Sequence, residues 1–313
     1  MTLPLIIDCD PGQDDAVAVL MALASPDELD LKGITTVGGN VPLSLTTTNA
    51  LKIVELAGRA SVPVHAGCPF PIMRPLVTAE YVMGNDGLAG ADLPKPTMQA
   101  APGHAVDFII ATLRNSPEPV TIATLGPQTN LALALIKAPD IRDNVARLVV
   151  MGGTMARGNI VPQAEYNIYV DPHAAQVVLN AGLDMVVIGL DVTHQVLNTV
   201  DRIRAIGDIG TRSAIAVNKM FMPHAEVQET LTYDDKPRGL MHDSCVTAYL
   251  LNPSLFSGKA VNMQIETSSE TTMGATVVDW WQVTKRNPNV TMMNTVDVEG
   301  FFELVFDRLG RLA

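Results

Sequence analysis

The sequence LPLIIDCDPGQDDAVAVLMALA, residues 3–24, is an apolar run that is interrupted by a cluster of acidic residues. The residues up to Ile7 are apolar apart from Pro4, and all residues from Ala16 to Ala24 are apolar. The Pro11–Gly12 pair between these runs is typical of a tight turn. The stretch therefore predicts a buried strand, a turn and a helix. Two of the acids fall in the first turn of that helix, where the helix dipole favours negative charge.

Four aspartates surround the turn, and their mutual repulsion indicates a cation. Side chains alternate along a strand, so Asp8 and Asp10 point to one side and Cys9 to the other. Two carboxylates about 4 Å apart repel by roughly 4 kcal/mol at an effective dielectric constant near 20. Either some of them are protonated or a cation holds them, and oxygen ligands alone suit Ca²⁺ or Mg²⁺. The alternative is two helix-capping acids, Asp14 and Asp15, beside two solvated turn acids.

Length, charge and cysteine content restrict the class of protein. The chain has 313 residues, with no linker or repeat that divides it, so we expect a single domain over 1–313. Its 21 basic and 33 acidic residues give a net charge of −12 without a basic block, which argues against nucleic acid as a partner. No apolar run reaches the length of a membrane span. The three cysteines form no C-x-x-C pair and the N-terminus lacks a basic signal segment, so we expect a cytoplasmic protein.

Strand-like and helix-like segments alternate along the rest of the chain. Strands are expected at 29–37, 62–66, 120–125, 147–151, 185–190, 261–266, 276–281 and 290–293, and helices at 43–57, 105–113, 129–137, 172–180, 200–206, 213–222, 244–251 and 300–309. This alternation predicts an α/β fold, an open and mainly parallel Rossmann-like sheet with helices on both faces. In such sheets ligands bind outside the C-terminal strand ends. Asp10, Asn40, Leu125 and Met151 all lie at predicted strand ends.

Motifs of other enzyme classes are absent or incomplete. The sequence has no G-x-G-x-x-G, phosphate-binding loop, G-x-S-x-G or H-E-x-x-H motif. Cys9 faces away from the carboxylates and is expected to pack in the core rather than act as a nucleophile. The Asp8-x-Asp10 pair is similar to the acidic strand end of aspartyl-phosphate hydrolases, but the D-x-D-G-T turn of those enzymes is replaced by Pro-Gly-Gln. Taken alone, the His242–Asp243 pair before an apolar helix is explained by an aspartate N-cap.

Several motifs together resemble the inosine–uridine-preferring nucleoside hydrolase family. They are DCDPGQDDAVAV in the opening stretch, VGGN ending at Asn40, LGPQTN at 125–130, MGG from Met151, AEYN at 164–167 and MHD at 241–243. They recur in order from residue 3 to beyond residue 250. The resemblance implies Ca²⁺-dependent hydrolysis of the N-glycosidic bond of ribonucleosides, which gives a free base and ribose.

The resemblance also assigns roles to site residues. Asp10, Asp15 and Asp243 are implied as metal carboxylates, and the carbonyl of Leu125 as a backbone ligand. Asp10 would also accept the proton of the attacking water, while His242 would act as the acid for the leaving base. Six residues are assigned to the sugar: Asp14 at the 2′-hydroxyl, Asn40 and Asn167 at ribose hydroxyls, Asn159 and Glu165 at the 5′ end, and Met151 beneath the ring.

The base-binding side departs from the family pattern. Members often carry a second histidine where Met83 stands here, so the preference for purine or pyrimidine is open. Tyr233, His224, Trp280 and Trp281 are further candidates for this side, and the segments around 70–100 and 223–240 are candidates for mobile walls that exclude water. The resemblance further implies a homodimer or homotetramer. A catalytically inactive, calcium-dependent nucleoside-binding protein is the alternative function.

Overall fold

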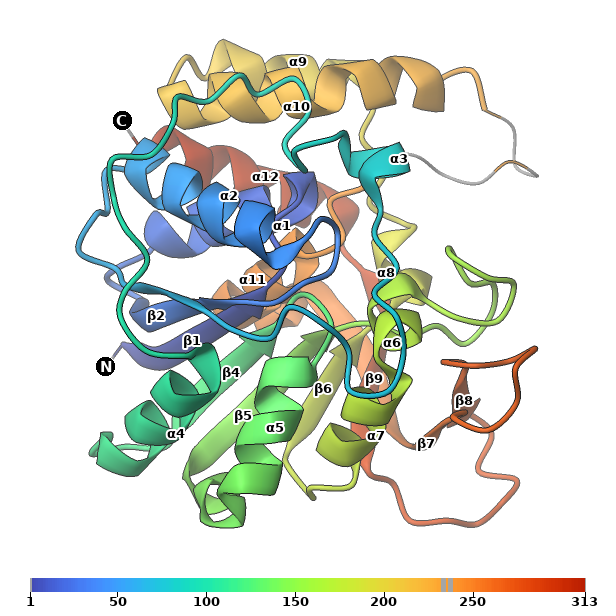
Figure 1. The fold of residues 1–313 in the computed structure, drawn as a ribbon. Coiled ribbons are helices and arrows are strands. Elements are labelled where there is room, and N and C mark those ends of the chain that lie inside the picture. The colour runs from blue at the N-terminus through green and yellow to red at the C-terminus, as the bar shows by residue number, and fades with distance from the viewer. Residues whose placement is uncertain (1, 232–234, 236–238, 313) are drawn as a thin grey trace.

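The computed structural model describes residues 2–231, 235 and 239–312. Within this part of the chain, nine strands form one sheet in the order β3-β2-β1-β4-β5-β6-β9-β7-β8 (Figure 1). The strands from β3 to β9 in this order pair in parallel, and β7 and β8 add an antiparallel edge. The prediction of an open, mainly parallel α/β sheet is therefore confirmed.

The strands are β1 (Leu3–Cys9), β2 (Leu29–Thr36), β3 (Val64–Ala66), β4 (Val120–Thr124), β5 (Val145–Met151), β6 (Met185–Ile188), β7 (Phe256–Ile265), β8 (Thr276–Asp279) and β9 (Val290–Val296). The longer helices are α1 (Gln13–Leu23), α2 (Leu43–Leu56), α4 (Ala105–Asn115), α5 (Thr129–Lys137), α7 (Pro172–Leu179), α9 (Val200–Asp208), α10 (Arg212–Gln228), α11 (Ser244–Leu251) and α12 (Val298–Gly310). The short ones are α3 (Glu80–Met83), α6 (Tyr166–Val170), α8 (Leu190–Thr193) and the 3₁₀ turns η1 (Pro139–Asn144) and η2 (Pro253–Leu255).

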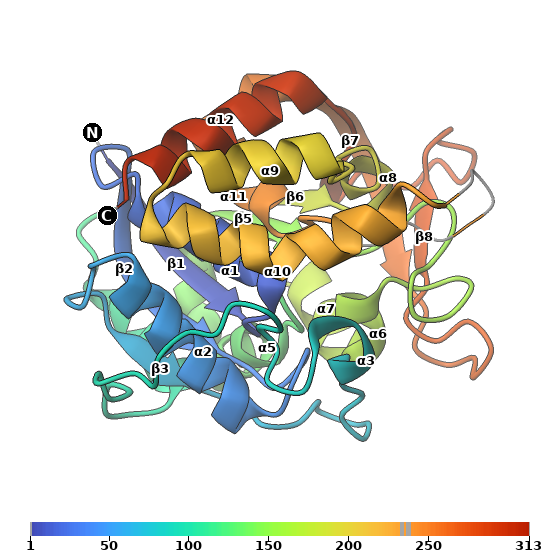
Figure 2. The ribbon, with the colours of Figure 1, turned by 90° about the horizontal axis from the view of Figure 1, so that it is seen from above.

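Helices cover both faces of the sheet and bury it completely in the middle. All five residues of β4 and all four of β6 are buried, as expected for parallel strands covered on both sides. One apolar core lies between the sheet and α1, α2, α11 and α12, and a second lies between the sheet and α4, α5 and α7 (Figure 1). Helices α9, α10 and α12 lie side by side over the first of these layers (Figure 2).

The main correction to the expected elements concerns α10. The prediction ended this helix at Met222, before Pro223, and placed a polar loop after it. The structure continues the helix to Gln228 with Pro223 inside it. A proline has no N–H for the carbonyl four residues earlier, which is that of Lys219. The helix continues because the burial of its apolar side chains against the rest of the fold outweighs this local penalty. The one-turn helices α3, α6 and α8 were not predicted either, and β7 begins five residues earlier than expected.

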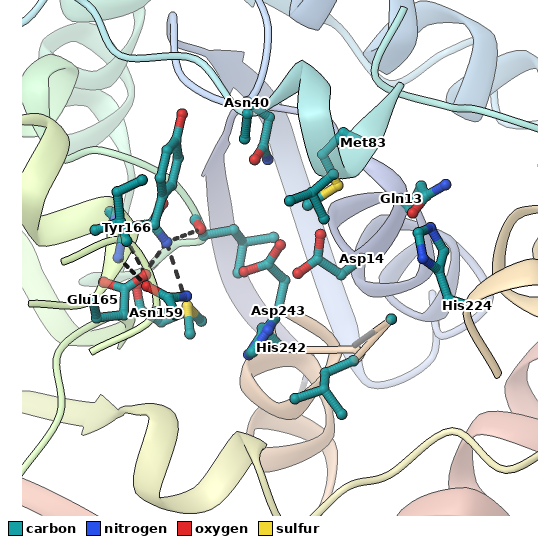
Figure 3. A pocket seen from close by; sticks show the side chains of 18 of the residues that line it. Gln13, Asp14, Asn40, Met83, Asn159, Glu165, Tyr166, His224, His242 and Asp243 are labelled. Atoms are coloured by element: carbon teal, nitrogen blue, oxygen red, sulfur yellow. Dashed lines mark hydrogen bonds between the residues drawn. The ribbon is translucent and has the colours of Figure 1, made fainter. Parts of the chain in front are cut away.

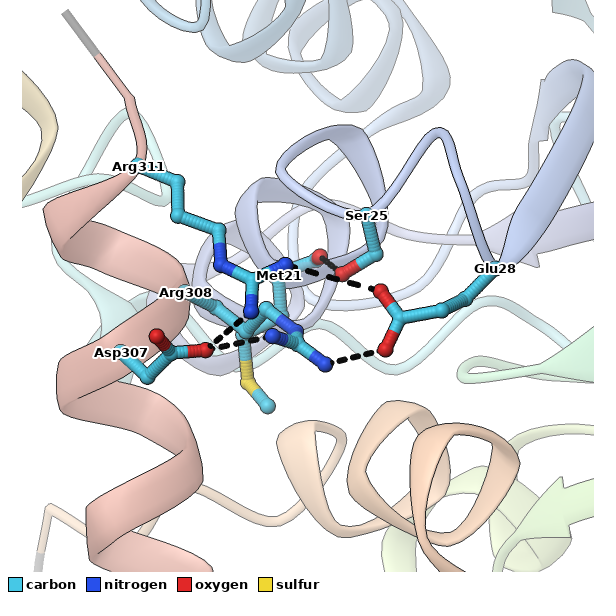
Figure 4. A network of polar contacts seen from close by, with 6 residues as sticks. All are labelled: Met21, Ser25, Glu28, Asp307, Arg308 and Arg311. Carbon is cyan, nitrogen blue, oxygen red and sulfur yellow. Dashed lines mark hydrogen bonds and ion pairs between the residues drawn. The ribbon is translucent and has the colours of Figure 1, made fainter.

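The C-terminal helix is tied to the turn between α1 and β2 by a group of ion pairs. Arg308 lies between Glu28 and Asp307, and Arg311 contacts the same two carboxylates (Figure 4). The Arg308 side chain is 6% exposed, so the pair with Glu28 is half-shielded from water. This network fixes α12 against the turn that follows α1, the helix that carries two of the acids. No helix in the described residues is long and apolar enough to cross a membrane.

Candidate active site

A cavity of about 220 Å³ opens where β1, β4 and β5 end (Figure 3). The cavity lies at the C-terminal strand ends, which is where the sequence predicts the site. Most of the side chains predicted for the site line this cavity, namely Asp14, Asn40, Leu125, Met151, Asn159, Glu165, Asn167, His242 and Asp243. Segments from the two ends of the chain are thus brought to one place by the parallel sheet.

Three carboxylates meet beside the cavity, and two of them, those of Asp14 and Asp243, line it. Oxygen atoms of Asp14, Asp15 and Asp243 lie within 4.8 Å of one another, and all three residues are buried. Asp15 is fixed by the turn before α1, because its carboxylate accepts hydrogen bonds from the backbone N–H of Gly12 (3.0 Å) and of Asp10 (3.2 Å). Asp243 directly precedes α11, which packs against α1. The start of α1 and the start of α11 therefore together form the acidic cluster.

Asp10 lies beside this cluster in a very narrow space. Its Oδ2 accepts a hydrogen bond from the backbone N–H of Asn40 (2.7 Å), whereas its Oδ1 is buried without a partner among the described residues. A Cβ atom added to Gly39 would lie 2.0 Å from Oδ2, and one added to Gly126 would lie 2.1 Å from Oδ1. Two glycines, one after β2 and one after β4, thus make room for this carboxylate.

Burial makes the charged forms of these acids costly. Desolvation, followed by the charge of Asp15, raises the pKa of Asp10 well above its usual value and that of Asp14 to about 8. Desolvation, followed by Asp14 and Asp15, raises the pKa of Asp243 in the same way. Desolvation also raises the pKa of Asp15. Such repulsion is removed either by protons or by a cation.

The donor set fits a hard divalent cation. The Oδ1 atoms of Asp10 and Asp14 are buried and have no hydrogen-bond partner within the described residues. The carbonyl of Leu125 also faces the cavity and is held in place by the Nδ2 group of Asn167 at 2.7 Å. All of these donors are oxygens, which is the chemistry that Ca²⁺ selects. Asp14, predicted for the sugar, lies in the compact triple of acids with Asp15 and Asp243.

A second group of residues forms the end of the cavity remote from α10. Glu165 is buried, and its carboxylate accepts hydrogen bonds from the N–H groups of Gly153, Asn167 and Ile168. Two of these bonds, from Asn167 and Ile168, cap the N-terminus of helix α6. Burial raises the pKa of Glu165 to about 7. The amide of Asn167 reaches the carbonyls of Leu125 and Met151, and the Asn159 side chain accepts a hydrogen bond from the N–H of Tyr166 (2.8 Å). This end is polar and rigidly bonded.

His242 lies between the acids and the opposite end of the cavity. Its Nδ1 atom is 2.7 Å from the hydroxyl oxygen of Thr193, which belongs to the one-turn helix α8. The ring of His194 lies 5.9 Å away, centroid to centroid, at an angle of 56°. This contact with Thr193 orients the imidazole ring, so Nε2 is the nitrogen that we assign to a substrate.

The end of the cavity opposite Glu165 is built from loops and from α10. Met83, Phe221, His224 and Leu240 line it, together with Gln13 (Figure 3). Met83 Sδ would lie 3.1 Å from a Cβ atom on Gly12, so this side chain packs on the turn before α1.

Of the other candidates for this side, neither tryptophan lines the cavity within the part of the chain that is described. Trp281 is 81% exposed, and the Lys259 ammonium group lies 4.1 Å from the Trp280 ring centroid. Tyr233 lies outside the described residues.

Some cavity residues were not predicted from the sequence. The main ones are Gln13, Tyr81, Val82, Tyr166, His194, Phe221 and Leu240. Thr193 was missed as well, although it follows a predicted strand at the same edge of the sheet as the other site residues. Their position just after a predicted strand could have identified Thr193 and His194 as candidate site residues.

Asp8 lies on β1 two residues before Asp10, and its hydrogen bonds join neighbouring elements of the fold. Its Oδ1 accepts hydrogen bonds from Thr35 Oγ1 (2.6 Å) and Asn130 Nδ2 (2.8 Å), which connect β1 to β2 and α5. Burial raises the pKa of Asp8 to about 6. Asp8 therefore holds the strand ends together from below the site.

Comparison with known proteins identifies a single family over nearly the whole chain. A family model described as inosine-uridine preferring nucleoside hydrolase matches residues 5–303. The pyrimidine-specific ribonucleoside hydrolase RihA of Escherichia coli K12 is 43% identical over 312 residues, which cover 99% of both chains. An uncharacterized protein of Schizosaccharomyces pombe is 48% identical over 99% of this chain and 100% of its own.

Solved structures agree with this similarity. A purine-preferring ribonucleoside hydrolase from Gardnerella vaginalis superposes with a TM-score of 0.89 at 31% identity, over 98% of both chains. The match therefore extends across the sheet and both helical layers.

Proposed function

The chain belongs to the inosine–uridine preferring nucleoside hydrolase family, and we propose that it hydrolyses the N-glycosidic bond of ribonucleosides with the aid of a bound calcium ion. The products are a free base and ribose. The observation that carries this proposal is that Asp14, Asp243 and His242 line one cavity, with Asp15 completing the triple of acids and Asp10 buried beside it. The family and its relatives act on N-glycosyl bonds, which supports the reaction class.

The residues that would hold the ion are the carboxylates of Asp10, Asp15 and Asp243 and the carbonyl of Leu125. Their oxygens supply part of the six to eight ligands that calcium takes, and substrate hydroxyls and water would supply the rest. When bound, calcium would lower the pKa of a neighbouring water molecule and orient the ribose hydroxyls. Asp14 lies close enough to the other acids to contribute to the same site.

Asp10 is the residue that we assign to proton removal from the attacking water. The N–H of Asn40 holds Oδ2, so the orientation of the carboxylate is fixed. Oδ1, which has no partner among the described residues, is then the atom that would receive the proton. The bond between the base and the anomeric carbon breaks with positive charge developing on the sugar ring. The surrounding carboxylates would stabilise that charge electrostatically.

The leaving base needs a proton, because a nucleobase anion is a poor leaving group. His242 Nε2 is the atom that we assign to this step, with Thr193 holding Nδ1. General acid catalysis of this kind is worth typically about 10²–10⁴-fold in rate. Asn40, Asn167, Asn159 and Glu165 would bind the ribose hydroxyls, with Met151 beneath the ring. Deoxyribonucleosides should be poor substrates because they lack the 2′-hydroxyl.

A panel of ribonucleosides in phosphate-free buffer with calcium chloride tests the proposed function. We expect free base, measured by chromatography, and an equal amount of ribose, measured as reducing sugar. Asp10→Ala is the matched control and should release neither. A strict requirement for phosphate with ribose 1-phosphate as product would contradict hydrolysis and indicate a phosphorylase.

The second candidate function is calcium-dependent nucleoside binding without catalysis. This chain keeps both Asp10 and His242: His242 lines the cavity and Asp10 lies buried beside Asp15, which argues for catalysis. Tight binding of a nucleoside that stays intact for hours would favour the alternative.

Three unpaired, buried cysteines suit the proposed cytoplasmic location. A homodimer or homotetramer stays a prediction, which light scattering can test.

A further inference from the structure

Gln13 occupies a position in the cavity that the proposed chemistry does not use. It is the residue directly before the acidic pair that begins α1, and it is 3% exposed. It lines the cavity beside Met83 and His224, at the end opposite Glu165 and Tyr166 (Figure 3). If the ribose binds at the Glu165 end, Gln13 lies where the base would be.

The orientation of the Gln13 amide is fixed by the two hydrogen bonds that its NH₂ group donates. Its Nε2 group donates hydrogen bonds to the carbonyl of Ala89 (3.2 Å), in the loop after α3, and to that of Met220 (3.4 Å), in α10. Both partners are carbonyl oxygens, which only accept hydrogen bonds. The nitrogen must therefore face these two carbonyls, and the opposite assignment of the amide would lose both bonds.

This arrangement leaves the amide oxygen for a ligand. Among the residues that the structure describes, none donates a hydrogen bond to Gln13 Oε1. Figure 3 shows the oxygen on the cavity side, toward Asp14 and His224, with the nitrogen turned away. Met83 and Phe221 have no N–H or O–H to offer it, and the structure shows no hydrogen bond from His224 to this oxygen. A fixed acceptor in a largely apolar wall is the kind of group that gives a pocket its specificity.

We propose that Gln13 is a specificity-determining residue whose Oε1 accepts a hydrogen bond from an N–H group of the nucleobase. The site would then favour bases that present a lactam or amino N–H at this end, such as the N3–H of uracil. The inference rests on the proposed nucleoside hydrolysis and adds which chemical group of the base is recognised. A base held in this way is bound equally in the ground state and the transition state, so the contact lowers KM more than it raises kcat.

Asn49 provides a matched control for the loss of the two donor bonds. Its side chain is 1% exposed, and its Nδ2 group donates to the carbonyls of Pro11 (3.0 Å) and Asp86 (2.6 Å). Asn49 therefore joins the loop after α3 to the turn before α1, close to the contacts that Gln13 makes. It belongs to α2, however, and is not among the residues that line the cavity. Asn49→Leu removes a similar connection without removing an acceptor from the cavity.

The test compares Gln13→Met and Asn49→Leu on two substrates in calcium-containing buffer. Uridine carries the N3–H, whereas p-nitrophenyl riboside has a leaving group without any N–H. We expect Gln13→Met to raise KM for uridine about tenfold or more relative to its change for p-nitrophenyl riboside, with kcat changed less. Asn49→Leu should change both substrates by the same factor.

Equal factors for the two substrates in Gln13→Met would overturn the inference while leaving the hydrolase function intact. If Gln13→Met does not fold, the wild-type protein still gives an answer, since 3-methyluridine lacks the N3–H and should have a KM at least several-fold above that of uridine. An equal KM for the two would also overturn it. Failure of the wild-type protein to cleave any ribonucleoside of the panel would contradict the proposed function itself, which is a different result.

Discussion

The two ends of the cavity are built from different kinds of segment. The end that holds the acids and the predicted sugar ligands comes from the ends of β1, β4 and β5 and from the starts of α1, α6 and α11. The opposite end comes from α3, the second half of α10 and the residues before α11. We call these the acid end and the base end. The acid end is continuous with the buried sheet, whereas the base end is joined to it through the helices on which α10 packs, mainly α9 and α1.

The loop after α3 and the start of α1 both contact α10 at one point. Pro223 leaves the carbonyl of Lys219 without its helical donor, and Gly90 packs so closely on that carbonyl that a Cβ atom there would lie 2.6 Å away. The next carbonyl, that of Met220, accepts the hydrogen bond from Gln13. The two carbonyl groups of α10 just before Pro223 thus contact the loop after α3 and the side chain of Gln13. The difference suggests a division in which the acid end performs the reaction and the base end selects the substrate.

The largest expected effect comes from a change at the acid end. Asp10→Asn replaces the carboxylate assigned to accept a proton by a non-basic amide and removes one negative charge near the sugar. We expect kcat to fall by roughly 10³-fold or more on every substrate, because the step is common to all leaving groups. Steady-state kinetics with uridine and p-nitrophenyl riboside would measure it. A large loss on uridine alone would place Asp10 on the base side and break the division.

His242→Ala should show an effect that depends on the leaving group. The imidazole lies between the two ends, and its assigned role is needed only by a base that leaves poorly. We expect kcat on uridine to fall by about 10²-fold or more, with a much smaller change on p-nitrophenyl riboside, whose leaving group needs no proton. The ratio of the two kcat values is the measurement. If both substrates were slowed equally, the acid role would be wrong.

Without a bound metal, the stability of the folded protein should depend on pH through the clustered acids. Burial and neighbouring charge raise the pKa of Asp14 to about 8 and those of Asp10 and Asp243 well above their usual 3.8. The folded protein without metal therefore holds protons that the unfolded chain has lost. The stability linked to these protons is fully present below about pH 4 and is lost as the pH rises toward 8 and above.

Thermal unfolding with a chelator or with calcium measures this dependence. We expect Tm without calcium to fall between pH 5 and pH 8. Calcium should raise Tm by roughly 5 °C or more at pH 8 and by less at pH 5, where protons compete for the carboxylates. A shift of equal size at both pH values would mean that the clustered acids are not the binding site.

The contrast between the ends also explains which residues of the cavity could be predicted from the sequence. The acid end follows from local rules, because strand ends of a parallel sheet meet at one edge and Asp10, Leu125 and Met151 each end a strand. The base end has no such rule. Phe221 and Leu240 are distant in the sequence and come together only through the packing of α10, whose continuation past Pro223 depends on tertiary contacts. Asp243 and Asp15 likewise meet through packing of α11 on α1, so only the family resemblance joined them.

The smallest expected effect comes from Met83→His, which restores at the base end the histidine common in the family. Met83 packs against the turn before α1 and offers no hydrogen-bond donor, so the wall that it forms is apolar. An imidazole adds one donor or acceptor there without touching the acids. We expect kcat/KM for uridine, cytidine and inosine to change by different factors, each within about tenfold. The value for p-nitrophenyl riboside should change least, because its leaving group has no N–H to donate. A uniform loss of 100-fold on all four would show that the two ends are coupled, since a change in the wall that contacts the base would then have disturbed the reaction itself.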